Sequence, residues 1–271
     1  MLPKPRSLNL IGIVQLLLAS TFVIWLLFFP GTGANFAWPV VPAFTAMFIG
    51  AGFIARAFIG FYLWRARTWP ELRWQAAANY AFLAVIFAAT AWHIDEMNWT
   101  TNIIVAHIWV LAYFIEPIML YLIEPRSAEA RMPLPLDLQR GPVFIGLKRI
   151  AVLGLITSFS IGAIAFANPQ FLDTRWPWPL DPFDARVMAA FFALAAFWCL
   201  TIYNGENWGE IRLAVVGAII LAVSNFIAWL VMLPSLDPTR MNIYAYGIVL
   251  GLFSLALAYY FIRHEWIKPK V

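Results

Sequence analysis

The sequence contains few of the residues from which a water-facing surface is built. Charged side chains make up 12% of its 271 residues, whereas hydrophobic side chains make up 63%. A soluble domain carries about 25% charged residues, so this chain cannot cover itself with a surface of ordinary composition. These proportions exclude a soluble globular protein and a disordered chain, and they predict an integral membrane protein.

Cysteine is also scarce, and the motifs of the best-known enzyme families are missing. The single cysteine, Cys199, has no partner for a disulfide, which excludes a disulfide-stapled secreted fold. The chain has no phosphate-binding Walker loop, dinucleotide fingerprint, HExxH zinc motif, nucleophile elbow or CxxCH haem-attachment motif. The sequence therefore names no catalytic residue and no metal ligand set, and it favours a non-enzymatic role.

Long hydrophobic runs, in contrast, recur along the whole chain. A run of about 20 residues crosses a hydrocarbon layer of about 30 Å as a helix, at about 1.5 Å per residue. No alternating pattern typical of a membrane barrel is present, so the runs should be helices. The sequence predicts an all-α integral membrane protein with eight transmembrane helices, at about residues 9–29, 43–64, 76–94, 102–123, 149–168, 185–203, 213–233 and 242–263.

The basic residues predict how these helices are oriented. Lys and Arg near the ends of spans are retained on the cytoplasmic side. With the N-terminus inside, the outer loops hold only Arg175, Arg186 and Arg240, while fourteen basic residues fall in the inner segments. Both termini should then be cytoplasmic in a multi-pass protein of the cell (inner or plasma) membrane. The inner charges suit anionic lipid headgroups, and they do not indicate a nucleic-acid partner.

The two halves of the chain resemble each other. A shift of 139 residues places residues 69–73 on 208–212, and both segments read Trp-x-Glu-x-Arg in the predicted inner loops. The Trp-Pro pair at 38–39 falls one residue from the pair at 178–179. These matches indicate an internal duplication.

The duplication predicts three parts. Residues 1–123 form a first four-helix transmembrane repeat, 124–148 a cytoplasmic proline-rich linker, and 149–271 a second four-helix repeat. Because each repeat crosses the membrane an even number of times, both repeats have the same orientation. We therefore expect a tandem, parallel four-plus-four arrangement with its pseudo-twofold axis along the membrane normal.

Two opposite charges lie deep within the predicted spans of the first half. Arg56 and Glu116 sit at depths of about 18 and 21 Å from the outer face, at about 1.5 Å per residue. A lone charge there costs at least about 2.5 kcal/mol, so we expect an intramembrane charge pair. Pro117 follows Glu116, frees the carbonyl of Tyr113 and predicts a helix kink. The pair is either a structural link between two helices or an anion or proton site. The aligned positions of the second half are apolar, which places intramembrane polar chemistry in the first half alone.

A candidate polar cluster lies near the outer face. His93, Asp95 and Glu96 close the third predicted helix, and His107 lies near the start of the fourth. Two imidazoles with a carboxylate are ligands for a divalent metal, and two histidines on neighbouring helices are axial ligands for haem. A simple hydrogen bond between a histidine and a carboxylate is the alternative.

Aromatic residues are abundant, with 14 Trp and 23 Phe. Such a set suits a pigment or a quinone, but membrane anchoring and helix packing explain most of the positions. Many of the tryptophans fall at the predicted boundaries, as aromatic belts do. The predicted outer belt is Trp38, Trp92, Trp99, Trp176 and Trp178, and the inner one is Trp64, Trp69, Trp74, Trp208 and Trp266.

Three functions follow from these features. The first is a non-catalytic polytopic subunit that packs in a larger membrane protein assembly and contacts lipids or hydrophobic cofactors. The second is a small-molecule or ion transporter with its site at Arg56 and Glu116. The third is a haem- or quinone-linked redox membrane protein that uses His93 and His107. Membrane lipids and other membrane subunits are the expected partners, with lipids the expected bound molecules.

Overall fold

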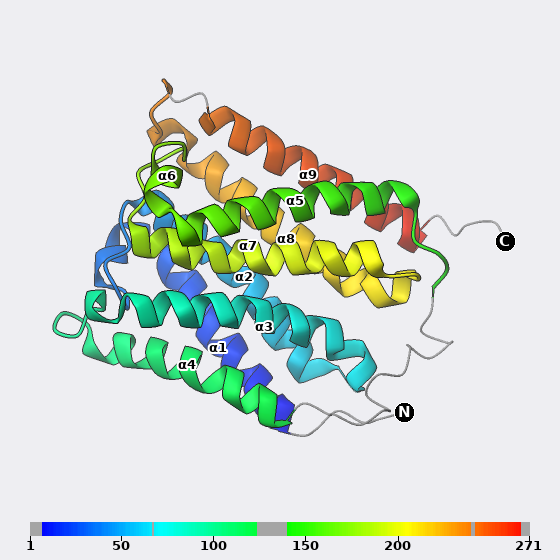
Figure 1. Cartoon of the computed structure of the whole chain (residues 1–271), viewed down its shortest axis with the longest axis horizontal. Coiled ribbons are helices and arrows are strands. Elements are labelled where there is room, and N and C mark those ends of the chain that lie inside the picture. Colours follow the sequence, from blue (N-terminus) through cyan, green and yellow to red (C-terminus); the bar gives the residue numbers. More distant parts are fainter. Residues whose placement is uncertain (1–6, 67, 124–139, 240–241, 267–271) are drawn as a thin grey trace.

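The computed structural model describes residues 7–66, 68–123, 140–239 and 242–266. In this part of the chain eight helices are long and apolar enough to cross a membrane (Figure 1). The prediction of an all-α, multi-pass membrane protein is confirmed at this level. The eight helices are α1 (Ser7–Phe28), α2 (Ala43–Arg65), α3 (Trp69–Trp92), α4 (Ile103–Ile123), α5 (Ile145–Ala167), α7 (Pro182–Asn204), α8 (Trp208–Met232) and α9 (Asn242–Trp266).

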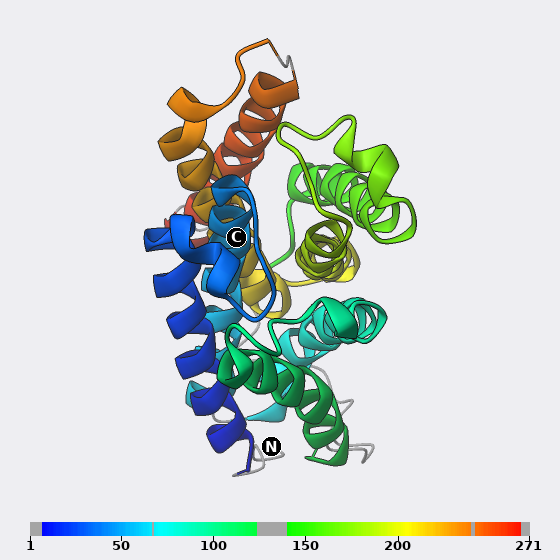
Figure 2. The same cartoon turned by 90° about the vertical axis from the view of Figure 1, so that its left-hand side faces the viewer.

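The short elements gather at one end of the bundle, here named the α6 end. They are the helix α6 (Pro169–Asp173) and the 3-10 turns η1 (Pro30–Asn35), η2 (Ile94–Glu96) and η5 (Leu233–Ser235). Helix α1 begins and α9 ends at the opposite end (Figure 1). Figure 2 views the molecule from the α6 end.

Several helices begin earlier than hydropathy predicts, because their first turns are polar. Asp181 caps α7 by accepting a hydrogen bond from the backbone N–H of Phe183, with Pro182 at the first helical position. Asn207 caps α8 by accepting from the N–H of Glu210. The two Trp-x-Glu-x-Arg segments, expected in loops, therefore form the first turns of α3 and α8. The loop prediction is wrong because a polar turn continues the helix beyond its apolar part.

Small residues allow two helix pairs to approach closely. Helix α1 packs along α2, and α5 packs along α7. A Cβ on Gly12 of α1 would lie 2.5 Å from the backbone nitrogen of Trp64, and a Cβ on Gly60 of α2 would lie 2.7 Å from the nitrogen of Leu16. In lipid, such close backbone contact supplies the van der Waals attraction that holds helices together.

This close approach predicts that Gly12→Ala destabilises the protein by about 1–3 kcal/mol, the usual cost of overpacking. Gly31→Ala is the matched control, because a Cβ on Gly31 would meet nothing within 4 Å. Thermal unfolding of the two variants in the same detergent measures the difference. Equal unfolding temperatures for both variants would contradict the glycine contact.

Each close pair also packs against a helix from the other half of the chain, and these two contacts are here named the crossed contacts. Helix α2 packs against α8, and α7 packs against α3. Helix α7 runs between α3 and α5, as Figures 1 and 2 both show. Helix α4 makes few close backbone contacts with the rest of the chain. It is therefore held mainly by long side chains.

The tryptophans divide between the core and the surface. Trp92 and Trp266 are exposed, as belt residues should be. Trp38, Trp178 and Trp208 are buried instead, and their indole N–H groups donate to protein acceptors. The belt interpretation is wrong for these three residues, because an indole can satisfy its polar edge inside a protein as well as at an interface. It is also wrong for Trp69 and Trp176, which are buried too.

Candidate functional site

The first polar cluster lies within the helical bundle and joins α2 to α4. The Nη2 atom of Arg56 lies 2.9 Å from Oε2 and 3.1 Å from Oε1 of Glu116. Arg56 is only 2% exposed and Glu116 13% exposed. The structure thus brings together the two charges that the sequence places at similar depth.

A third helix completes this charge pair. Asn79 of α3 is fully buried and donates from Nδ2 to Oε1 of Glu116 over 2.9 Å. The guanidinium of Arg56 lies 4.5 Å from the ring centre of Phe82, also on α3. The carboxylate therefore accepts hydrogen bonds from two helices, and the cation gains an aromatic contact. Pro117 lies inside α4, which continues beyond it to Ile123.

Another polar contact fastens α4 in addition to the charge pair. It is a hydrogen bond of 3.0 Å from the indole N–H of Trp109 to the hydroxyl of Thr90 on α3. Both sets of residues are buried or nearly so. Since α4 makes few close backbone contacts, these side chains help to position the helix.

Removing one charge of the pair should be strongly destabilising. Arg56→Met or Glu116→Leu alone leaves its partner buried and unpaired, at an expected cost of about 3–5 kcal/mol. The double variant should recover most of that loss, because it buries no charge. Thermal or denaturant unfolding of all four proteins forms a double-mutant cycle.

The matched control for this cycle is the pair Arg73 and Glu210, which is 3.7 Å apart and partly exposed on both sides. Its coupling should be weaker than that of Arg56 and Glu116, because its atoms are farther apart and its side chains are more exposed. A coupling between Arg56 and Glu116 no larger than this control would contradict a dry, buried pair.

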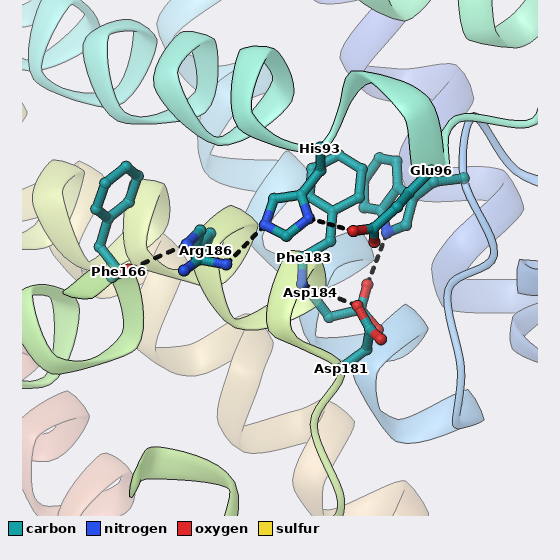
Figure 3. Close-up of polar contacts among 8 residues, drawn as sticks. His93, Glu96, Phe166, Asp181, Phe183, Asp184 and Arg186 are labelled. Carbon is teal, nitrogen blue, oxygen red and sulfur yellow. Dashed lines mark hydrogen bonds and ion pairs between the residues drawn. The ribbon is translucent and has the colours of Figure 1, made fainter. Parts of the chain in front are cut away.

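The second polar cluster lies at the α6 end and is shown in Figure 3. Arg186 of α7 donates from Nη1 to Nε2 of His93 over 2.7 Å, and Nδ1 of His93 lies 2.7 Å from Oε1 of Glu96. Because Nε2 accepts a hydrogen bond from a cation, it carries no proton. The imidazole is then neutral, and Nδ1–H donates to the Glu96 carboxylate.

Three helices meet in this cluster. Arg186 donates from Nε to the carbonyl of Phe166, the penultimate residue of α5, over 3.0 Å. Its guanidinium lies 4.6 Å from the ring centre of Trp92, at the end of α3. Phe183 of α7 stacks on the His93 ring at 4.7 Å with an interplanar angle of 9°. The cluster links the ends of α3 and α5 to the start of α7.

A buried carboxyl group lies beside this cluster, two residues before Arg186 on α7. Asp184 is fully buried and accepts a hydrogen bond of 2.7 Å from the indole N–H of Trp38. A similar bond of 3.0 Å runs from the indole of Trp178 to the hydroxyl of Thr45 on α2. Each bond connects one half of the chain to the other.

The sequence patterns did not predict the buried positions of Asp184 and Arg186. Arg186 was expected in an outer loop, and the second half was expected to hold no polar chemistry within the bundle. Both residues instead lie in the first two turns of α7 and are buried. The Asp181-Pro182 capping signature would have placed them on the helix, because it marks a helix start four residues before the apolar run.

The remaining residues of the predicted outer cluster are not brought together. His107 is exposed and bonds through Nδ1 to the carbonyl of Ile103 on its own helix, with its ring against Trp99. Asp95 is exposed. Within the described ranges no group of three His, Cys, Asp or Glu side chains is close enough to hold a metal. The structure therefore joins His93 to Glu96 and Arg186, while His107 bonds elsewhere.

Comparison with known protein families, with curated proteins and with solved structures finds no match to this chain. The chemistry of the two clusters therefore carries the functional argument alone.

The paired indole bonds give a further prediction. Trp38→Phe should destabilise the protein by about 1–3 kcal/mol, because it leaves a fully buried carboxyl group without its indole donor. Trp178→Phe is the matched control and should cost less, since the Thr45 hydroxyl is neutral and is more easily buried. Thermal unfolding of both variants makes the comparison. A larger loss of stability in Trp178→Phe than in Trp38→Phe would contradict the expectation that the buried carboxyl group of Asp184 depends more on its indole donor than the Thr45 hydroxyl does.

Proposed function

We propose that the chain is a non-catalytic polytopic membrane subunit that packs in a larger membrane protein assembly. The observation that supports this proposal is the paired state of the central charges. Arg56 and Glu116 neutralise each other, and Asn79 also bonds to the carboxylate. These groups connect α2, α3 and α4, and each central charge is paired with an opposite charge inside the chain.

Two hollows of the described structure also favour a packing role. One hollow is an apolar crevice beside Met47, Asn225 and Met232, with a volume of about 10 Å³. The other is a shallow surface depression of about 370 Å³ beside Trp25 and Phe29. Neither hollow is lined by Arg56 or Glu116. A transport site at the charge pair would need a water-filled route that reaches it.

The outer faces of four helices provide the surface for lipids and for partner subunits. Large apolar side chains stand exposed along α1, α4, α5 and α9, as a hydrocarbon environment allows. They include Leu10, Leu17, Ile24, Ile104, Leu111, Ile118, Leu122, Leu153, Ile156, Phe159, Ile248, Leu252 and Leu255. We propose that lipids cover part of this surface and other membrane proteins the rest.

The proposed arrangement in the membrane is a tandem four-plus-four repeat with both termini in the cytoplasm of the cell. The reciprocal indole bonds support the repeat. Thr45 and Asp184 are 139 residues apart, and each accepts from a tryptophan of the opposite half. Helix α2 against α8 and α7 against α3 form the corresponding pair of crossed contacts.

Gentle purification tests the subunit proposal. The tagged full chain, extracted from its membrane in a mild detergent, should elute with other membrane proteins in fixed ratio. Native mass spectrometry reports those partners and any bound small molecules together. A monodisperse chain that carries lipid alone, also after cross-linking in the intact membrane, would overturn the proposal.

A transporter is the second candidate, because two buried oxygens near the charge pair are unsatisfied. Oδ1 of Asn79 and Oε1 of Gln15 have no hydrogen-bond partner within the described part of the chain. Nε2 of Gln15 donates to the backbone carbonyl of Arg56. If this region carries protons, reconstituted vesicles should show pH-driven flux that Glu116→Gln abolishes. No contact of His93 or His107 gives comparable support to a haem- or quinone-linked role.

A further inference from the structure

The positive charge of Arg186 has no direct counter-charge among the described residues. It reaches the carboxylate of Glu96 only through the imidazole of His93. Arg186 is 8% exposed, and no carboxylate of the described residues lies within 4.0 Å of its guanidinium. A guanidinium has five N–H donors, of which Phe166 and His93 accept one each. Three donors, including both on Nη2, have no acceptor among the described residues.

The guanidinium is nevertheless held in a fixed orientation. The Phe166 carbonyl and the His93 imidazole bond it from two sides (Figure 3). The ring of Trp92 also covers it. Trp92 is 67% exposed, and its ring meets that of Phe166 at 6.4 Å, edge to face. The cation thus lies recessed in the seam where α3 and α5 border α7, at the α6 end of the bundle.

The other half of the chain shows that the fold does not require a cation at this place. Under the proposed duplication, on which this comparison rests, Arg186 corresponds to Met47 and His93 to Met232. Those two methionines line the same apolar crevice, with Phe44 where the first cluster has Phe183. Two methionines therefore occupy the place in one repeat contact that an arginine and a histidine occupy in the equivalent contact.

We propose that Arg186 binds an anionic oxygen group, a phosphate or a carboxylate, at the seam between Trp92 and Phe166. Such groups accept two hydrogen bonds from a guanidinium and cancel its charge. The neutral His93, itself held by Glu96, is a positioning residue that directs the guanidinium. A lipid phosphodiester at the membrane boundary and a free phosphate ion carry the same chemistry.

The test uses the full chain in a neutral detergent. Native mass spectrometry counts bound phosphatidylglycerol against phosphatidylcholine, and thermal unfolding is followed during titration with inorganic phosphate. Preferential binding of phosphatidylglycerol identifies a lipid headgroup as the source, while stabilisation by inorganic phosphate alone identifies a free anion. Either result, if it depends on Arg186, supports the site. Binding of neither probe would overturn it.

Variants show whether the effect belongs to Arg186. Arg186→Met, which copies the apolar counterpart, should weaken anion binding at least about tenfold, since charge-assisted hydrogen bonds are lost. Arg175→Met is the matched control, because Arg175 is an exposed arginine at the same end of the bundle. An equal loss in both variants would indicate general surface charge and overturn the proposal.

A further measurement keeps the test decisive if Arg186→Met fails to fold. In the unmodified protein, the bound anion should slow modification of Arg186 by an arginine-specific dicarbonyl reagent, with Arg175 as the internal reference. Unchanged modification of Arg186 at saturating anion would overturn the site. Anion binding is measured on the purified chain and requires no partner protein. The anion site and the subunit proposal can therefore fail independently of each other.

Discussion

A bilayer offers neither water nor counter-ions to a side chain buried in its interior, and the bundle depends on how its polar groups meet that constraint. Arg56 on α2 and Asn79 on α3 both donate to the carboxylate of Glu116 on α4, so that the charges pair across three helices. Helix α4 has few close backbone contacts, so its position follows from this network and from the bond between Trp109 and Thr90. The polar residues here act as specific fasteners between otherwise apolar surfaces.

The two polar clusters differ in how their cations are neutralised. In the centre of the bundle a cation faces a carboxylate directly. At the α6 end the cation of Arg186 reaches Glu96 only through a neutral imidazole, and three of its donors have no acceptor in the described chain. The first arrangement is suited to holding helices in register. The second retains hydrogen-bonding capacity at the surface, which is where a ligand or a headgroup can supply the missing acceptor.

Small residues, and not polar side chains, hold the closest helix pair together. Gly12 and Gly60 let α1 and α2 approach until their backbones touch. Aromatic rings fill the space farther out, and the indoles of Trp38 and Trp178 each reach across to the other half. A tryptophan near a helix end can therefore serve as an internal connector, and its place in the sequence does not distinguish that role from membrane anchoring.

The sequence by itself determined the class of protein, the number of membrane-length helices and the similar positions of Arg56 and Glu116 along their helices. These properties depend on composition and on distance along one helix, which a sequence records directly. Only the tertiary structure decided that Asn79 joins the pair, that Asp184 and Arg186 are buried, and that His93 faces α7 while His107 does not. Those outcomes depend on the rotation and the neighbours of each helix, and both are set by packing among residues far apart in the chain.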